Sequence, residues 1–300
     1  MRKALKVTLY VFVVLIAIAA LLALLAHVLS ERKRQRTIDV PVDPLAYVSD
    51  EASLTRGKYL FMSRGCAECH GENGSGHVVI DEGGMFITSP NITAGPGSVV
   101  ANYHEVDWVR TIRHGIKPDK HPVILMPSGD YNQLTNADLA ALVAYVRSLP
   151  PVAGEGAVIR LPLIVKALYA VGQIKDDAET IDHTRPPPNP IAEAVTPESG
   201  AYVANICIGC HGAGLSGGTI PGTPPDWPPA ANLTPGNGSA LARYDTPNKF
   251  VTMMRTGKRP DGSDVSTVMP FATLNNLNDT ELGALYAYLK TLPPRAAGNR

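Results

Sequence analysis

Two short stretches of the chain place cysteine and histidine at spacings that could do chemistry. The first is CAECH, residues 66–70, and the second is CIGCH, residues 207–211; together they contain all four cysteines of the 300-residue chain. On a helical turn, residues at i, i+3 and i+4 lie on one face, so two thiols and an imidazole project to the same side. Each stretch could therefore hold one group through two sulfurs and bind a metal with the ring nitrogen.

Three kinds of site use a Cys-x-x-Cys pair. A structural zinc ribbon needs its second pair about 15 to 20 residues further on, whereas here the second pair begins only at Cys207. A thioredoxin-type redox pair needs a strand-helix-strand context that the sequence does not show. Covalent haem attachment explains the histidine that follows both pairs. We therefore predict two haem c groups, bound covalently by Cys66, Cys69, Cys207 and Cys210, with His70 and His211 as axial iron ligands.

The second half of the sequence repeats the first. PNIT (90–93) corresponds to ANLT (231–234), RHGIKPD (113–119) to RTGKRPD (255–261), and LMP (125–127) to VMP (268–270). The closing stretches LTNADLAALVAYVRSLPP (134–151) and LNDTELGALYAYLKTLPP (277–294) share nine identical residues. Because solenoid repeats have periods of only about 20 to 50 residues, this pattern indicates one duplicated domain.

The pattern of apolar residues favours helices. In the closing stretch of each copy, apolar residues recur at steps of three and four, and a proline at 150 or 293 stops the helix. No alternating apolar run predicts a sheet. We expect an all-α fold with two tandem domains, 53–152 and 194–300. Residues 31–52 and 153–193 are expected to be linkers, the second with an apolar first part that packs against a domain and a proline-rich, extended remainder.

Composition limits both the core and the partners. The chain has 27 Gly and 26 Pro, and aromatic residues make up 6%, so a domain of about 100 residues has few large side chains for its core. Bound haem would supply the missing apolar volume. The 27 basic and 27 acidic residues balance, which leaves no basic stripe for phosphate groups. We expect no nucleic-acid partner.

The N-terminal 36 residues contain a long apolar run. Residues 7–29 are interrupted only by Thr8 and His27, and this length is enough to span a bilayer. A cleaved signal peptide has a shorter apolar region of about 7 to 15 residues. We therefore expect residues 1–30 to be a retained transmembrane anchor. Basic residues flank both ends of the run, so the positive-inside rule does not orient it.

Each haem iron needs a sixth ligand or an open site, and methionine is the repeated candidate. Met269 and Met126 each precede a proline at corresponding positions of the two copies, and a thioether is a common sixth ligand of c-type haem. We predict Met126 and Met269 as these ligands. The alternatives are Met253 and Met254 in the second copy, and Met85, His77, His104, His114 and His121 in the first.

Other repeated residues suggest supporting roles. Asn91 and Asn232 lie in N-x-T sequences, but their corresponding positions favour a loop fixed near the haem edge over glycosylation. Arg113 and Arg255 could pair with the haem propionates, although a solvated helix end would also explain them.

The order of these motifs resembles a known family. Cys-x-x-Cys-His, then NIT, an Arg-x-Gly turn, Met-Pro and LTNADLAALVAYVRSLPP are similar to the membrane-anchored multihaem cytochrome c subunits of periplasmic dehydrogenases, such as those that oxidise alcohols, aldehydes or N-heteroaromatic acids (the molybdenum hydroxylase type). The resemblance covers residues 53–152 and 194–298. It implies that haem is attached outside the bacterial cytoplasmic membrane, which would place both haem domains in the periplasm behind a single-pass anchor.

The resemblance implies electron transfer as the function. A periplasmic dehydrogenase would be the electron donor, and a terminal oxidase, a quinone-linked complex or a soluble cytochrome would be the acceptor. Methionine ligation fits a relay because it fills both irons, and no catalytic acid or base stands out in the sequence. Alternatives are a dihaem enzyme of the peroxidase or thiosulfate dehydrogenase type, which needs an iron open to substrate, or a cytochrome subunit of a terminal oxidase.

Overall fold

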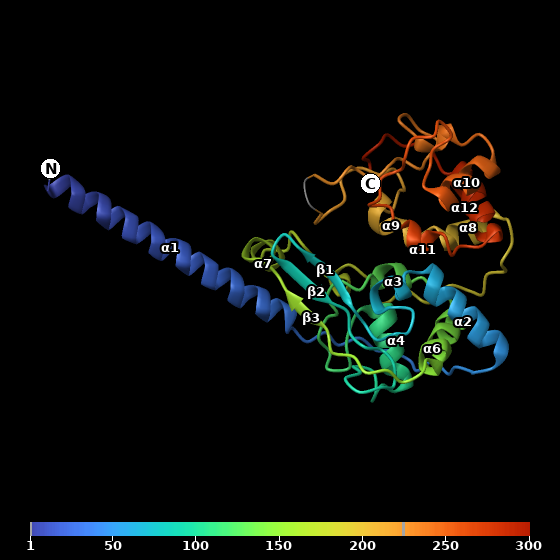
Figure 1. The fold of residues 1–300 in the computed structure, drawn as a ribbon, viewed down its shortest axis with the longest axis horizontal. Helices are drawn as coiled ribbons and strands as arrows, with labels where there is room; N and C mark the ends of the chain where they lie inside the picture. The colour runs from blue at the N-terminus through green and yellow to red at the C-terminus, as the bar shows by residue number, and fades with distance from the viewer. Residues whose placement is uncertain (1, 224–225) are drawn as a thin grey trace.

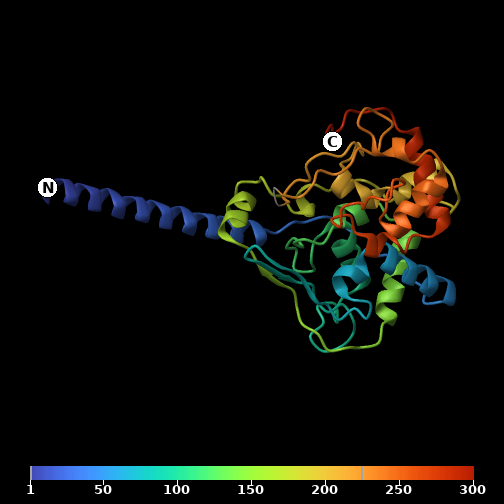
Figure 2. The same cartoon turned by 45° about the horizontal axis from the view of Figure 1, so that its top comes forward.

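A long helix projects from two small, mostly helical lobes that lie against each other (Figure 1). The structure is a computed structural model that describes residues 2–223 and 226–300. Residue 1 of the expected anchor and residues 224 and 225 of the expected second domain lie outside the described part. Turning the molecule by 45° leaves the long helix pointing away from both lobes (Figure 2).

The projecting helix is α1 (Arg2–Arg34). Its most apolar 18-residue window has a mean hydropathy of 3.0, and by length and composition it is the one helix among the described residues that could cross a membrane. Most of its large apolar side chains are exposed, from Leu5 to Leu29. An isolated apolar helix of this length has no protein core to bury it, which is the pattern of a membrane anchor or a leader sequence.

The first lobe is built on two crossed helices. Asp50 caps the first of them by accepting a hydrogen bond from Ser53 N, and Thr135 caps the second. Gly57 lets the two approach closely, because a Cβ there would lie 2.0 Å from the Ala141 carbonyl oxygen. The helices of this lobe are α2 (Glu51–Ser63), α3 (Cys66–His70), α4 (Glu105–His114), α5 (Ser128–Tyr131) and α6 (Asn136–Ser148), with α2 crossing α6.

The second lobe repeats this arrangement. Gly200 takes the place of Gly57, and a Cβ there would lie 1.9 Å from the Ala284 carbonyl oxygen. Asn278 caps the closing helix. The elements are α8 (Pro197–Val203), α9 (Asn205–His211), the short 3-10 helix η2 (Ala240–Arg243), α10 (Pro247–Thr256), α11 (Phe271–Leu274) and α12 (Asp279–Thr291), with α8 crossing α12. The all-α class and the duplication predicted from the sequence are confirmed.

One small sheet departs from the expectation of no strands. Strand β2 (Met85–Thr88) pairs antiparallel with β1 (Val78–Glu82) on one side and with β3 (Val158–Arg160) on the other. The tight turn at Gly83 and Gly84, both at positive φ, closes the hairpin. The sequence pattern did not predict this sheet because its strands are only three to five residues long. Its third strand also comes from the segment that was expected to be a linker.

The segment between the lobes is more structured than a linker. After β3 it forms α7 (Leu163–Ala170) and the short 3-10 helix η1 (Asp177–Glu179). Helix α7 contacts α1 and lies beside its lobe-proximal end in both views (Figures 1 and 2). The apolar part thus packs, as expected, but its neighbour is the end of α1 and not one of the two domains. The proline-rich remainder has no helix or strand between residues 180 and 196.

Candidate haem sites

The two Cys-x-x-Cys-His motifs form short helices, as the haem interpretation requires. Helix α3 ends at Gly71 with φ +75°, and α9 ends at Gly212 with φ +78°, a backbone region that glycine adopts easily because it has no Cβ. All four cysteines are free of disulfide bonds. Each pair is separated by one helical turn, so both sulfurs and the histidine are on one face.

Each motif histidine is oriented by a backbone carbonyl. The Nδ1 atom of His70 lies 3.0 Å from the Pro90 oxygen, and that of His211 lies 2.8 Å from the Ala231 oxygen. An Nδ1–H that donates to a carbonyl leaves Nε2 unprotonated and fixes the ring plane, which is how proteins prepare a metal-ligating imidazole. Burial lowers the pKa of both histidines, against the opposing effect of these hydrogen bonds. Both rings are thus neutral near pH 7.

The carbonyls are held in place by the repeated asparagines. Asn91 Nδ2 donates to the Val152 oxygen at 2.9 Å, and its Oδ1 accepts from Thr93 N at 2.8 Å. Asn232 makes the corresponding bonds to the Arg295 oxygen and to Thr234 N. Both asparagines are buried. These bonds and their burial agree with the expected role of fixing the loop that carries each carbonyl.

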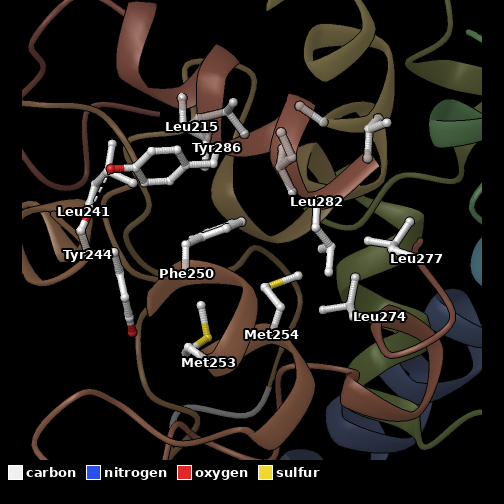
Figure 3. Packing of buried hydrophobic residues seen from close by; sticks show 14 residues of the cluster. Leu215, Leu241, Tyr244, Phe250, Met253, Met254, Leu274, Leu277, Leu282 and Tyr286 are labelled. Carbon is white, nitrogen blue, oxygen red and sulfur yellow. Dashed lines mark hydrogen bonds between the residues drawn. The ribbon is translucent and has the colours of Figure 1, made fainter. Parts of the chain in front are cut away.

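The second lobe contains a cavity in which the predicted ligands meet. It has a volume of about 310 Å³ and is lined by Cys207, His211 and Met269, with apolar side chains around them. Figure 3 shows part of this lining, with Phe250, Met253 and Met254 on α10. In the first lobe, Met126 and Cys66 pack against the same hydrophobic cluster. Cys69 and His70 lie on α3 and Cys210 lies on α9, the two attachment helices that carry the Cys-x-x-Cys-His motifs. The assignment of Met126 and Met269 to iron stays a prediction.

Two of the histidines that compete with Met126 have ring partners elsewhere. His114 Nδ1 lies 3.0 Å from Nδ1 of His183, and His121 Nδ1 lies 3.2 Å from the Arg36 oxygen. His104 is the N-cap residue of α4 through its backbone, and His77 stays an alternative. Met85 is in strand β2. In the second lobe, the alternatives Met253 and Met254 are buried core residues of α10 (Figure 3). These contacts favour the methionines that precede proline.

Two buried donors in the first lobe fit a bound haem. Among the described residues, Trp108 Nε1 and Arg113 Nε are the buried side-chain polar atoms without a hydrogen-bond partner, and both are on α4. Buried donors are almost always satisfied, and the two carboxylates of a haem would satisfy these. Arg113 was predicted to have this role. Trp108 was missed, although Phe250 at the corresponding position of the repeat is the aromatic signal that could have identified it.

Arg255 does not share the environment of Arg113. Its Nη2 pairs with Asp279 Oδ1 at 2.9 Å, and its side chain is one-third exposed. It is not among the residues that line the cavity, where Arg243 and Arg259 supply the positive charge instead. The sequence suggested Arg255 because it corresponds to Arg113 in the repeat. In the structure, however, the Arg255 guanidinium contacts Asp279 at the N-terminus of α12.

The two lobes meet through a reciprocal pair of tyrosine contacts. Tyr59 OH donates to Glu281 at 2.5 Å and accepts from Asn278 N at 3.1 Å. At the corresponding positions, Tyr202 OH donates to Asp138 at 2.7 Å and accepts from Thr135 N at 3.1 Å. Each tyrosine thus caps the closing helix of the other lobe. The duplicated domains form an interface like that of a symmetric dimer, where one contact occurs twice.

The same relation brings the haem segments together. Helix α5, which follows Met126, contacts attachment helix α9, and α11, which follows Met269, contacts attachment helix α3. Thr273 on α11 also donates a hydrogen bond to Glu68 on α3. Each attachment helix therefore lies beside the short helix that follows the predicted methionine ligand of the other lobe.

One buried ion pair lies at this junction. Arg64, two residues before Cys66, donates to both Glu281 oxygens at 2.7 and 3.0 Å, and each side chain is 3% exposed. Burial by itself would lower the pKa of Arg64, but the hydrogen bond and charge of Glu281 outweigh it and raise the pKa. Arg64 therefore stays positively charged at the interface between the lobes.

A carboxyl group on α5 faces the second attachment helix. A Cβ on Gly209 would lie 3.6 Å from Asp130 Oδ2, and Asp177 accepts a hydrogen bond from Gly129 N beside it at 2.7 Å. Burial, and then the charge of Asp177, raise the pKa of Asp130 to about 7. This group therefore titrates near neutral pH next to the second site.

Comparison with known families decides what these sites are. The model of the family described as cytochrome c matches twice, at residues 54–150 and 199–293. The chain belongs to the cytochrome c family. Both matches contain one attachment motif and one Met-Pro pair, and the donor sets described above suit haem in each. This cytochrome carries two haem c groups.

Two known relatives resemble this cytochrome over most of its length, and a third resembles part of it. The fructose dehydrogenase cytochrome subunit of Gluconobacter japonicus is 24% identical over 291 residues, which is 85% of this chain and 56% of the relative. The cytochrome c subunit of the quinone alcohol dehydrogenase of Gluconobacter oxydans is 26% identical over 271 residues, 82% of this chain and 56% of the relative. A diheme cytochrome c-type protein of Cereibacter sphaeroides is 29% identical over 126 residues, 38% of this chain and 42% of the relative. The chain spans about half the length of the first two.

Proposed function

We propose that this chain is a dihaem electron relay, anchored in the bacterial cytoplasmic membrane with its lobes in the periplasm. It takes electrons from a partner dehydrogenase and passes them toward the respiratory chain. The observation that carries the proposal is the reciprocal interface, which sets each haem segment against the other. Two haems held side by side in this way can pass an electron from one to the other within a single chain.

The haem irons supply the chemistry, because each exchanges one electron between the ferric and ferrous states. The protein's part is to hold and tune them. The Pro90 and Ala231 carbonyls orient His70 and His211. Met126 and Met269 would supply the second protein ligand of each iron. A sulfur ligand raises the potential relative to a second histidine, and a filled iron has no site for substrate.

In the first lobe, the unpartnered donors of Trp108 and Arg113 would hold the haem propionates. In the second lobe this role falls to Arg243 or Arg259, since both line the cavity. Arg255 lies instead at the end of a helix. The buried pair of Arg64 and Glu281 keeps the lobes in one arrangement. None of these groups needs to move a proton for the electron to pass.

The anchor assignment is supported by how α1 ends. Ser30 is buried, Arg36 pairs with the buried carboxylate of Asp176 at 2.7 Å, and Lys33 pairs with Glu179 at 2.9 Å. A leader sequence that is removed has no reason to make specific contacts in the mature fold. These contacts favour a retained anchor.

The partner is inferred from the relatives, which are named as cytochrome subunits of fructose and alcohol dehydrogenases. The acceptor in this proposal is a terminal oxidase, a quinone-linked complex or a soluble cytochrome. The test is to purify the full chain from its own membranes in mild detergent. Its dehydrogenase should copurify, and the substrate of that enzyme should reduce both haems in the complex but not in the separated chain. A separated chain that oxidises substrate unaided would contradict the relay.

A further inference from the structure

Helix α7 presents an apolar face that no part of the described chain covers. Leu163, Ile164 and Leu168 are 48%, 66% and 37% exposed, and Val171 directly after the helix is 70% exposed. At 3.6 residues per turn these side chains lie within an arc of about 140°. The intervening Ala167 is also apolar. Such a width is typical of a helix that buries one face.

The opposite face of α7 is tied to the anchor. Tyr169 is buried and its carbonyl accepts from Lys33 Nζ at 2.9 Å. Its hydroxyl donates to Asp176 at 2.6 Å, and Asp176 accepts two hydrogen bonds from Arg36, both at 2.7 Å. Because Asp176 is nearly completely buried, these bonds fix α7 to the end of α1.

The contacts also set the height of α7 along α1. Lys166 Nζ lies 3.1 Å from His27 Nδ1, while Tyr169 is level with Lys33, so the two helices run in the same direction. His27 is two residues before Leu29, where the apolar run ends. Since each residue rises 1.5 Å, the Tyr169 contact places the start of α7 level with His27, and the Lys166 contact places it about 5 Å deeper.

The anchor itself carries a matching face. Among residues 2–29, all are exposed except Ala23 and Ala26, and Ser30 just beyond them is buried. Spacings of three and four place these small residues on one side of α1, and α1 contacts α7. The contact therefore extends along the last two turns of the apolar run. If the run lies in a bilayer, the beginning of α7 lies in it as well.

We propose that α7 is a membrane wedge, whose exposed apolar face inserts into the periplasmic leaflet of the bilayer that α1 spans. The depth matches that of interfacial helices, which bury about 5 to 10 Å into the boundary between headgroups and acyl chains. Arg32 and Lys175 are exposed just beyond the apolar run of α1 and the end of α7, where their positive charges can pair with lipid phosphates. This inference rests on the proposed retention of α1 as an anchor.

The wedge would do more than strengthen attachment. A single spanning helix lets the attached lobes tilt and turn relative to the membrane. A second contact beside it removes much of that freedom. The wedge therefore fixes which side of each lobe faces the membrane and which side is open to a partner.

The test uses spin labels on the full-length protein in nanodiscs of phosphatidylethanolamine and phosphatidylglycerol. All native cysteines hold haem, so one introduced cysteine is the single free thiol. Three variants are compared: Ile164→Cys on α7, Leu15→Cys in α1, and Val195→Cys, which is 62% exposed in the segment between the lobes. Power saturation then measures the access of apolar oxygen and of a water-soluble nickel chelate to each label.

We expect oxygen to relax the labels at Ile164 and Leu15 several-fold more than nickel does, and the reverse at Val195. A label at Ile164 that nickel reaches as freely as at Val195, with Leu15 still in lipid, overturns the wedge alone. If the Leu15 label is also in water, the proposed anchor is wrong. Shielding of Ile164 from both reagents would show that protein covers this face, which also overturns the wedge.

A second variant tests the consequence for orientation. Ile164→Asp/Leu168→Asp alters exposed positions, so both haem spectra should be unchanged. In oriented bilayers, the linear dichroism of the haem bands should fall relative to the wild type because the lobes are freer to tilt. The same loss should not occur with Val195→Asp. Dichroism equal to that of the wild type would contradict the proposal.

Discussion

Replacing Glu281 by alanine should destabilise the protein more than any comparable change at the lobe interface. The carboxylate accepts two hydrogen bonds from Arg64 and one from Tyr59. Glu281→Ala leaves the Arg64 cation buried without its partner. Breaking a buried pair in this way costs about 3 to 5 kcal/mol. The effect should be at the upper end, because each side chain of the pair is only 3% exposed.

The duplicated domain supplies a matched control. Asp138 has the corresponding position and pairs with Arg56 at 2.8 Å, but here the side chains are 12% and 29% exposed. Burial alone would raise the pKa of Asp138, but its hydrogen bonds and the charge of Arg56 lower it. Since water screens this pair, Asp138→Ala should cost only about 1 to 2 kcal/mol, between the values for exposed and buried pairs.

Guanidinium unfolding of the haem-loaded protein in detergent, followed by circular dichroism, measures both costs. Loss of stability shifts the midpoint, and a change in slope would show that the lobes unfold separately. The double variant Arg64→Met/Glu281→Leu should recover most of the loss, because it leaves no unpaired charge. The reasoning is refuted if Glu281→Ala costs no more than Asp138→Ala, or if the double variant is as unstable as the single one.

Three further predictions follow from the packing and the sites. Gly200→Ala should destabilise the second lobe by roughly 3 kcal/mol or more, because its Cβ would overlap a carbonyl oxygen at 1.9 Å. Gly283→Ala on α12 is the control and should be tolerated. Thermal melts compare the stability of the two variants. Burial and a neighbouring carboxylate raise the pKa of Asp130 to about 7, so the folded state binds a proton that the unfolded chain loses near pH 4. The unfolding free energy should therefore fall as pH rises from about 4 to 7, and Asp130→Asn should remove that part of the pH dependence in denaturant titrations. Met269→Ala should remove about half of the weak near-infrared charge-transfer band of methionine-ligated ferric haem and Met126→Ala the other half; a band unchanged in Met126→Ala would give the first haem a different ligand.

Much of the site could be predicted because its chemistry is local in the sequence. Cys-x-x-Cys-His fits within one helical turn, so His70 and His211 needed no knowledge of the fold. The repeat added long-range information, since it paired Met126 with Met269 and Asn91 with Asn232.

What could not be predicted depends on contacts between distant segments. Trp108 has its role because its indole nitrogen is buried without a partner, and burial is a property of the packed lobe. Arg255 corresponds to Arg113 in sequence, but Asp279 on a neighbouring helix turns it away. The capping of one lobe by Tyr59 or Tyr202 of the other arises only when the two lobes are in place.

The relay is tested most directly by adding carbon monoxide to the fully reduced, separated chain. If His70 with Met126 and His211 with Met269 fill both irons, carbon monoxide should bind slowly or not at all, because an axial ligand must leave first. Peroxide and thiosulfate should then turn over only at background rates. Rapid binding of carbon monoxide to either haem, with turnover at enzymatic rates of about 1 to 1,000 per second, would contradict the relay and indicate a dihaem enzyme.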